Sequence, residues 1–129
     1  MTYLHLGSTQ SVITGTLAQL PAGMTHLYLY STQSVITGGA GAPVAKNVQT
    51  INLDSTGRTA GDVDELLMYL YAQRAQWAYT GHLLSVAGTN ADPNGLYQDA
   101  TPPTTGNEYR YKLVNDPDAE GFKKWTITV

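Results

Sequence analysis

The eight residues STQSVITG at positions 8–15 recur without change at positions 31–38, a spacing of 23 residues. Chance agreement over eight residues is rare, so this identity marks an internal repeat. A period between 20 and 30 residues is typical of a solenoid in which each repeat adds one strand and one return segment. The sequence therefore predicts an α/β fold, a short solenoid with a parallel sheet on one face.

Alternating apolar residues before each copy predict the strands of this sheet. Alternation over this length is typical of a half-buried strand whose apolar residues face the core. A third, less regular copy lies one residue beyond the strict period, because Ile51 follows Leu27 by 24 positions. The strands are predicted at 1–7, 24–30, 49–54, 82–86 and 125–129, and the inward residues are Leu4, Leu6, Leu27, Leu29, Ile51 and Leu53.

The return segments between the strands are predicted to differ from one another. The first two lack a helical pattern, and the second is rich in glycine, so we expect irregular chain or short 3₁₀ turns. The inward residues of the first segment should be Val12, Ile13, Leu17 and Leu20.

The third return segment carries the signals of a helix. Thr59 and Asp62 form the pattern of a capping box, in which each side chain accepts from the backbone amide of the other residue. Apolar residues then follow at helical spacing, which predicts a helix over 60–76. These apolar residues are Val63, Leu66, Leu67 and Leu70.

The remaining chain is predicted to form a cap. Turn-forming residues dominate 89–107, which indicates an extended loop. Asp116-Pro117 has the pattern of an N-cap followed by proline, so we expect a short helix that ends near Gly121. The stretch 109–114 fits a helix and a strand almost equally well.

Length and composition limit the class of protein. The 129 residues are predicted to form one domain, with repeat-like strands and return segments in 1–58 and a helix, a strand and a cap in 59–129. A net charge of −3 offers no basic surface for nucleic acid. No stretch approaches the roughly 20 apolar residues that cross a bilayer, so we expect no membrane insertion. Without cysteine there are no disulfides and no thiolate ligands.

The alternation also predicts which side chains project from the open face of the sheet. These outward residues form rows that run across the strands. Tyr and His supply rigid contact area with a hydrogen-bonding tip, as binding surfaces require. Aromatic residues also suit exposed strands through their β-propensity alone, and the sequence leaves both interpretations open. The predicted contact surface consists of Tyr3, His5, His26, Tyr28, Tyr30, Asn52 and Asp54.

Motifs that would carry catalysis or bind a cofactor are weak. His5 and His26 could begin a metal site with Asp54, but the two histidines are offset by one row, and chance placement explains them better. The stretch 90–95 starts like a calcium loop, yet Thr101 stands where a bidentate Glu is needed, which favours an ordinary turn. No Ser has a convincing His and acid partner. We therefore expect no metal, no cofactor and no enzymatic activity.

The repeat unit resembles that of leucine-rich-repeat proteins. It reads Met-Thr-x-Leu-x-Leu-x-Ser-Thr-Gln-Ser-Val-Ile-Thr-Gly, with Thr9-Gln10 and Thr32-Gln33 near the place where the family has a buried Asn. The second half of the chain resembles a capping segment found in leucine-rich-repeat-like proteins of bacteria and their phages, so the resemblance covers nearly the whole chain. The segments that carry it are 53–55, 63–67, 85–90 and 121–129.

This resemblance implies a binding or structural part rather than an enzyme. Because 1–6 lacks the features of a signal peptide, we expect a structural or adhesive module of a phage virion or tail that engages other proteins. The alternatives are a carbohydrate- or protein-binding module within a longer bacterial surface protein, and a cytoplasmic protein. Since Met1 falls inside a predicted strand, we expect that strand to pair with a partner protein or with a second copy.

Overall fold

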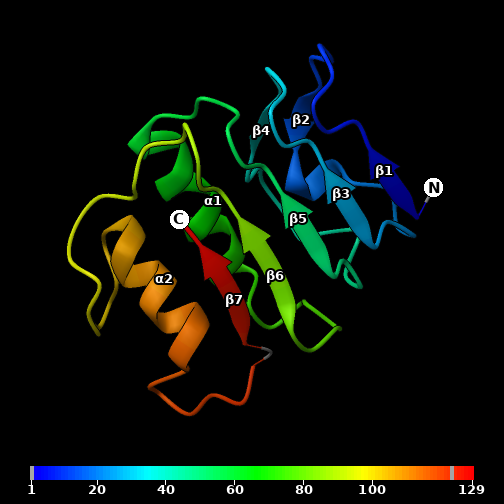
Figure 1. Cartoon of the computed structure of the whole chain (residues 1–129). Coiled ribbons are helices and arrows are strands. Elements are labelled where there is room, and N and C mark those ends of the chain that lie inside the picture. Colours follow the sequence, from blue (N-terminus) through cyan, green and yellow to red (C-terminus); the bar gives the residue numbers. More distant parts are fainter. Residues whose placement is uncertain (1, 123) are drawn as a thin grey trace.

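A computed structural model describes residues 2–122 and 124–129 and has a mixed α/β fold with a parallel sheet and two helices (Figure 1). The sheet has five strands in the order β1-β3-β5-β6-β7, and every neighbouring pair is parallel. All five predicted strands are present, although each is shorter than predicted. Their bounds are β1 Tyr3–His5, β3 His26–Tyr28, β5 Thr50–Asn52, β6 His82–Ser85 and β7 Trp125–Thr128.

The register of this sheet confirms the predicted inward row. Leu4 pairs with Leu27 and Leu27 with Ile51, and the row continues through Leu84 and Ile127. All of these side chains are buried except Leu4, which lies in an edge strand and is partly buried against the same core. Since side chains alternate along a strand, the residues on either side of this row lie on the opposite face of the sheet.

The same turn follows each of the first three strands of the sheet. Its threonine hydroxyl donates to the carbonyl three residues earlier, at 2.6 Å for Thr9, 2.7 Å for Thr32 and 2.8 Å for Thr56. A hydroxyl group therefore satisfies a backbone carbonyl at the same point of each of these turns. Each of these threonines follows a serine with a left-handed φ of 54–58°, and the serines are Ser8, Ser31 and Ser55.

The first two return segments are more regular than predicted. Strands β2 (Thr14–Thr16) and β4 (Val35–Thr37) pair in a separate, parallel two-stranded sheet. Their β-branched residues favour extended chain, and this preference outweighs the nearby glycines. The expected 3₁₀ turn is present in the first segment as η1 (Leu17–Gln19).

Side chains of the first return segment follow the prediction only in part. Leu17 is buried, and Ile13 and Leu20 are partly buried against the core, as predicted. Val12, in contrast, is 61% exposed, so its predicted inward position is wrong. The chain is extended here, and neighbouring side chains face opposite ways, so Val12 points outward when Ile13 points inward.

The predicted helix begins where expected and ends early. Helix α1 (Ala60–Ala72) has the full capping box, with Thr59 accepting from the Asp62 amide and Asp62 accepting from the Thr59 amide. Its predicted end at residue 76 is wrong, because the chain turns after Ala72 to bring Trp77 into the core. The Trp77 indole then donates to the Leu70 carbonyl at 3.2 Å.

A second helix settles the ambiguous stretch 109–114. Helix α2 (Gly106–Asn115) contains that stretch and starts with its own capping box, formed by Thr105 and Glu108. The loop predicted over 89–107 therefore ends two residues earlier. None of the helices in the described ranges 2–122 and 124–129 is long and apolar enough to cross a membrane.

The predicted short helix after Asp116 is wrong. Asp116 is the C-cap of α2, with a left-handed φ of 45°, and Pro117 lies in a turn. The Asp116 carboxylate does accept backbone amides, from Glu120 and Gly121, both at 3.0 Å. The same side chain that would cap a helix start thus closes a turn, since aspartate tolerates left-handed backbone and bonds local amides in both settings.

Candidate binding surface on the open face of the sheet

Five rings on β1 and β3 and just beyond them form a continuous cluster, which we call the aromatic patch. The register places Tyr3 beside His26 and His5 beside Tyr28, as the outward rows predicted. Six pairs of ring centroids lie between 5.2 and 6.2 Å apart, so every ring contacts at least one other. The aromatic patch consists of Tyr3, His5, His26, Tyr28 and Tyr30.

Tyr30 reaches the patch because its neighbour in the row has no side chain. The Tyr30 ring lies over Gly7, where an added Cβ would stand only 2.3 Å from the nearest ring carbon. This placement brings the Tyr30 hydroxyl within 2.9 Å of His5 Nε2, at hydrogen-bonding distance. The glycine thus lets the ring fold back toward His5.

The patch is accessible and chemically mixed. Tyr3 is 53% exposed and His5 is exposed, while the other three rings are half-buried. Neighbouring ring planes meet at angles from 24° to 66°, so the surface is uneven rather than a flat platform. Tyrosine and histidine combine apolar area with polar tips, which suits reversible contact with a partner.

Asn52 and Asp54, the other two predicted contact residues, lie at the end of β5 and just beyond it, and both serve the scaffold. Asn52 Oδ1 accepts the Asp54 amide at 3.0 Å. Asp54 Oδ1 accepts the Ser85 hydroxyl at 2.6 Å and the Ala87 amide at 2.7 Å. These bonds hold the end of β5 to the end of β6, so the two residues lie beside the patch without joining its ring contacts.

The three side chains of the weak metal pattern, His5, His26 and Asp54, contact other protein groups. His5 bonds Tyr30, and His26 Nδ1 lies 2.9 Å from the hydroxyl of Thr25. Asp54 has the partners just described. Within the described part of the chain, no three His, Cys, Asp or Glu side chains come close enough together to hold a metal ion.

A polar groove beside the patch was not predicted. It has a volume of about 730 Å³ and runs along the turns that follow the strands. The STQ motif could have indicated it, because the motif stands at the same point of the first two turns, after β1 and after β3. Its lining consists of Thr9, Gln10, Ser31, Thr32, Gln33, Ser55 and Thr89.

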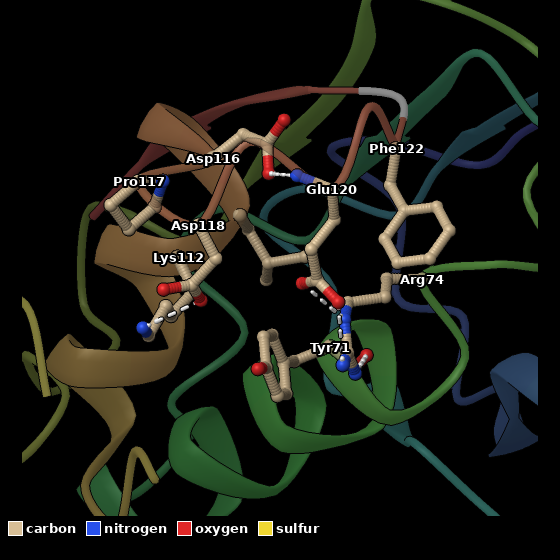
Figure 2. A pocket seen from close by; sticks show the side chains of 9 residues that line it. Tyr71, Arg74, Lys112, Asp116, Pro117, Asp118, Glu120 and Phe122 are labelled. Carbon is tan, nitrogen blue, oxygen red and sulfur yellow. Dashed lines mark hydrogen bonds and ion pairs between the residues drawn. The ribbon is translucent and has the colours of Figure 1, made fainter. Parts of the chain in front are cut away.

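A second unpredicted feature is a small pocket in the cap, with a volume of about 10 Å³ (Figure 2). Arg74 crosses it, with its guanidinium 4.1 Å from the centroid of the Tyr71 ring and 3.0 Å from the Glu120 carboxylate. The hydrogen bond that Arg74 donates to Glu120 raises the pKa of Arg74 above its ordinary value, although burial opposes this. Ion pairs within the chain thus close the pocket, and these ion pairs hold the cap together.

Lys112 forms the other side of this pocket. Its buried ammonium lies 2.8 Å from both Asp99 and Asp118 and 3.0 Å from the Thr101 hydroxyl. Burial alone would lower the pKa of Lys112, but the two carboxylates outweigh it and raise the pKa above its usual range. A single cation therefore ties α2 to the loop before it and the turn after it.

Glu108 joins the same loop to the start of α2. Its carboxylate accepts the Thr104 amide at 2.8 Å and the Thr105 amide at 3.2 Å, and Gln98 donates to its other oxygen. The Thr104 hydrogen bond is the largest cause that holds the pKa of Glu108 below its ordinary value. A charged carboxylate suits this position at the positive end of the helix.

Comparison with known proteins gives no identification. The chain matches no family model, and searches of curated proteins and of solved structures return no match.

Proposed function

We propose that this chain is a non-catalytic adhesive or structural module that engages another protein through the aromatic patch. The observation that carries the proposal is the cluster of five touching Tyr and His rings on the open face of the sheet. Rigid aromatic side chains with polar tips dominate the energetics of many interfaces. The uneven tilt of the rings favours interdigitation with protein side chains over a flat ligand.

We further propose that the scaffold is a short leucine-rich-repeat-like solenoid and that the module belongs to a phage virion or tail. The three successive serine–threonine turns and the constant strand register support a repeated unit. Solenoids of this kind use their sheet face for binding. The assignment to a virion rests on the sequence resemblance alone.

A glycan partner is the second candidate, favoured by the polar groove. The hydroxyl and amide groups that line the groove include Ser31, which directly follows Tyr30 of the patch. Sugars require such hydrogen-bonding groups next to apolar area. This reading matches a module of a bacterial surface protein.

The test compares one double-site variant and one single-site variant on two kinds of target. Labelled chain is applied to a glycan array and to a panel of purified phage capsid and tail proteins. Tyr28→Ser combined with Tyr30→Ser should lower binding by at least about 10-fold, since interface tyrosines are frequent hot spots. Tyr79→Ser, which removes an exposed tyrosine outside the patch, should leave binding unchanged.

The outcomes separate the readings. Loss of binding to a capsid or tail protein supports the first candidate, and loss on the glycan array supports the second. If the double variant unfolds by circular dichroism, the rings serve the stability of the sheet instead. Binding that both variants retain would exclude the aromatic patch as the contact surface.

Association through β1 is a separate part of the proposal. In the described residues β1 pairs only with β3. The amides of Leu6 and Ser8 donate to carbonyls on the β3 side, at Tyr28 and Tyr30. Because amides alternate in direction along a strand, the Tyr3 amide points to the outer edge. Tyr3→Pro should therefore block pairing of that edge without removing a bond within the sheet. Analytical ultracentrifugation should show a concentration-dependent mass for the wild type and for Tyr3→Ala, but not for Tyr3→Pro. A wild type that stays monomeric would contradict this association.

A further inference from the structure

A groove of about 710 Å³ lies between the edge strand β7 and helix α2, away from the aromatic patch. Figure 1 shows α2 beside β7 at the end of the sheet opposite β1. One wall is the strand itself, from Trp125 to Ile127, and the other includes Tyr97, Arg110 and Val114. The groove therefore runs along the outer edge of the last strand.

The ladder of the sheet indicates which backbone groups face this groove. In each strand an inward residue donates its amide to the next strand: Leu29 to Asn52 at 2.9 Å, and Leu53 to Ser85 at 2.8 Å. Val86 of the following repeat donates to Thr128 of β7 at 2.9 Å. By the same register, the amides of Ile127 and Val129 point outward from β7, where a further strand would accept them.

Among the described residues, two cations at this groove lack the carboxylate partners that Arg58, Arg74 and Lys112 have. Arg110 and Lys124 line the groove, and neither has an ion pair within the described part of the chain. No carboxylate lines the groove either, although the chain as a whole carries a net charge of −3.

Arg110 is held in place by Tyr97 and Asn107. Its guanidinium lies 4.4 Å from the centroid of the Tyr97 ring, and Nη1 donates to Asn107 at 3.3 Å. Its Nε is buried and has no hydrogen-bond partner in the described ranges. A buried donor without a partner is unfavourable, and a carboxylate is the group that would satisfy it most strongly.

We propose that this groove binds an extended acidic peptide segment of a partner protein, which pairs with β7 as a sixth strand. Its backbone would accept from the Ile127 and Val129 amides, and its carboxylates would pair with Arg110 and Lys124. Strand addition at an open edge is a common mode of peptide recognition, with the backbone giving affinity and the side chains specificity. The proposal does not depend on the function of the aromatic patch.

The test uses three labelled eight-residue peptides with the full chain. One alternates Glu and Val, and the others replace every Glu by Gln or by Lys. Fluorescence anisotropy should show saturable binding of the Glu peptide that weakens with added salt, and little binding of the other two. Amide hydrogen exchange at Ile127 and Val129 should slow at saturation, while the Tyr3 amide on the opposite edge should not change.

Matched variants connect binding to the groove. Arg110→Gln combined with Lys124→Gln should weaken binding of the Glu peptide by at least about 10-fold. Lys46→Gln is the control, because Lys46 is exposed, has no ion pair among the described residues and lies outside the groove. Equal binding of the Gln peptide, or unchanged binding to the double variant, would overturn the proposal.

Self-association is the competing occupant. A concentration-dependent mass that Arg110→Gln with Lys124→Gln abolishes, together with no binding of the Glu peptide, would assign the groove to a second copy and overturn the proposal. Circular dichroism of the double variant checks that it folds. A folded variant that loses the Glu peptide, while Lys46→Gln keeps it, supports the acidic segment.

Discussion

The two ends of the five-stranded sheet use aromatic rings in opposite ways. At the β1–β3 end, five Tyr and His rings gather on the open face. At the β6–β7 end, Trp77, His82 and Trp125 lie inside, where the His82 and Trp125 rings stack with centroids 4.5 Å apart. The first cluster is available to a partner, and the second stabilises the fold.

Charged residues are also distributed unequally between the first and second parts of the chain. Only one of the seventeen charged residues, Lys46, precedes residue 54. The first part is held by hydroxyl groups that bond backbone carbonyls, as at Thr32. The second part is held by capping boxes and by ion pairs such as those of Lys112 and Arg74. The ion pairs that stabilise the cap and the rings of the aromatic patch therefore lie in different parts of the chain, which the following predictions test.

The largest effect is expected from the buried rings. Trp125 is 3% exposed and contacts both Trp77 and His82, so Trp125→Ala should lower the free energy of unfolding by about 3–5 kcal/mol. Tyr3→Ala in the aromatic patch should cost less than about 1 kcal/mol. Urea denaturation followed by circular dichroism gives both values. Similar losses for the two variants would contradict the division between the clusters.

The next effect concerns Lys112, the cation that ties the cap together. Lys112→Met keeps the apolar stem but removes the bonds to Asp99, Asp118 and Thr101, and should cost about 1–3 kcal/mol. Because the pKa of Lys112 is raised above its ordinary value of 10.5, its contribution is present at neutral pH and is lost as pH rises past that value.

Measurements of stability against pH test this sign. The difference between wild type and Lys112→Met should stay constant from neutral pH to about pH 10 and then shrink as lysine deprotonates. Lys46→Met is the control and should show little difference from wild type at any pH. A difference that grows at alkaline pH would show that Lys112 does not act through its charge.

A smaller effect separates two threonines with identical sequence neighbours on their C-terminal side. Thr32 is 4% exposed and donates to Leu29, whereas Thr9 is exposed and donates to Leu6 with the same geometry. Thr32→Val should cost about 1–2 kcal/mol because it leaves a buried carbonyl without its donor. Thr9→Val should cost less than about 0.5 kcal/mol. Denaturation curves with equal midpoints would show that burial does not decide the value of this bond.

Sequence reasoning succeeded where the signal is local. Alternation predicted the five strands and the row that runs through Leu27 and Ile51, because side chains reverse direction at every residue of a strand. The capping box at Thr59 predicted the start of α1, since both of its bonds join residues three apart. The pairs Tyr3–His26 and His5–Tyr28 followed from the same alternation.

The features that the sequence did not predict depend on contacts between residues that are distant in the sequence. The two identical octapeptides do not pair in the register of the repeat: Thr14 lies opposite Val35, two residues away from its own copy at Thr37. A shift of two keeps each side chain on its face, so sequence alone cannot exclude it. The early end of α1 was set by the core position of Trp77. The groove beside β7 required the placement of α2.

Gly7→Ala has the smallest predicted effect. It tests whether the rings of the patch can rearrange while the fold stays unchanged. Residue 7 has no left-handed φ, so alanine suits its backbone, but the new Cβ would strike the Tyr30 ring. We expect Tyr30 to swing away and lose its bond to His5, with a change in stability of less than about 1 kcal/mol. The proton chemical shifts of both rings should change in NMR spectra.

Gly61→Ala is the matched control for this variant, because its nearest atom outside the helix backbone lies 3.9 Å from an added Cβ. It should leave the ring shifts of Tyr30 and His5 unchanged. Unchanged ring shifts in Gly7→Ala would show that the glycine does not set the position of Tyr30. If Gly7→Ala loses as much stability as Thr32→Val, the rings stabilise the sheet. A surface that serves only to bind a partner can rearrange without weakening the scaffold beneath it, so a small loss is expected for a contact surface.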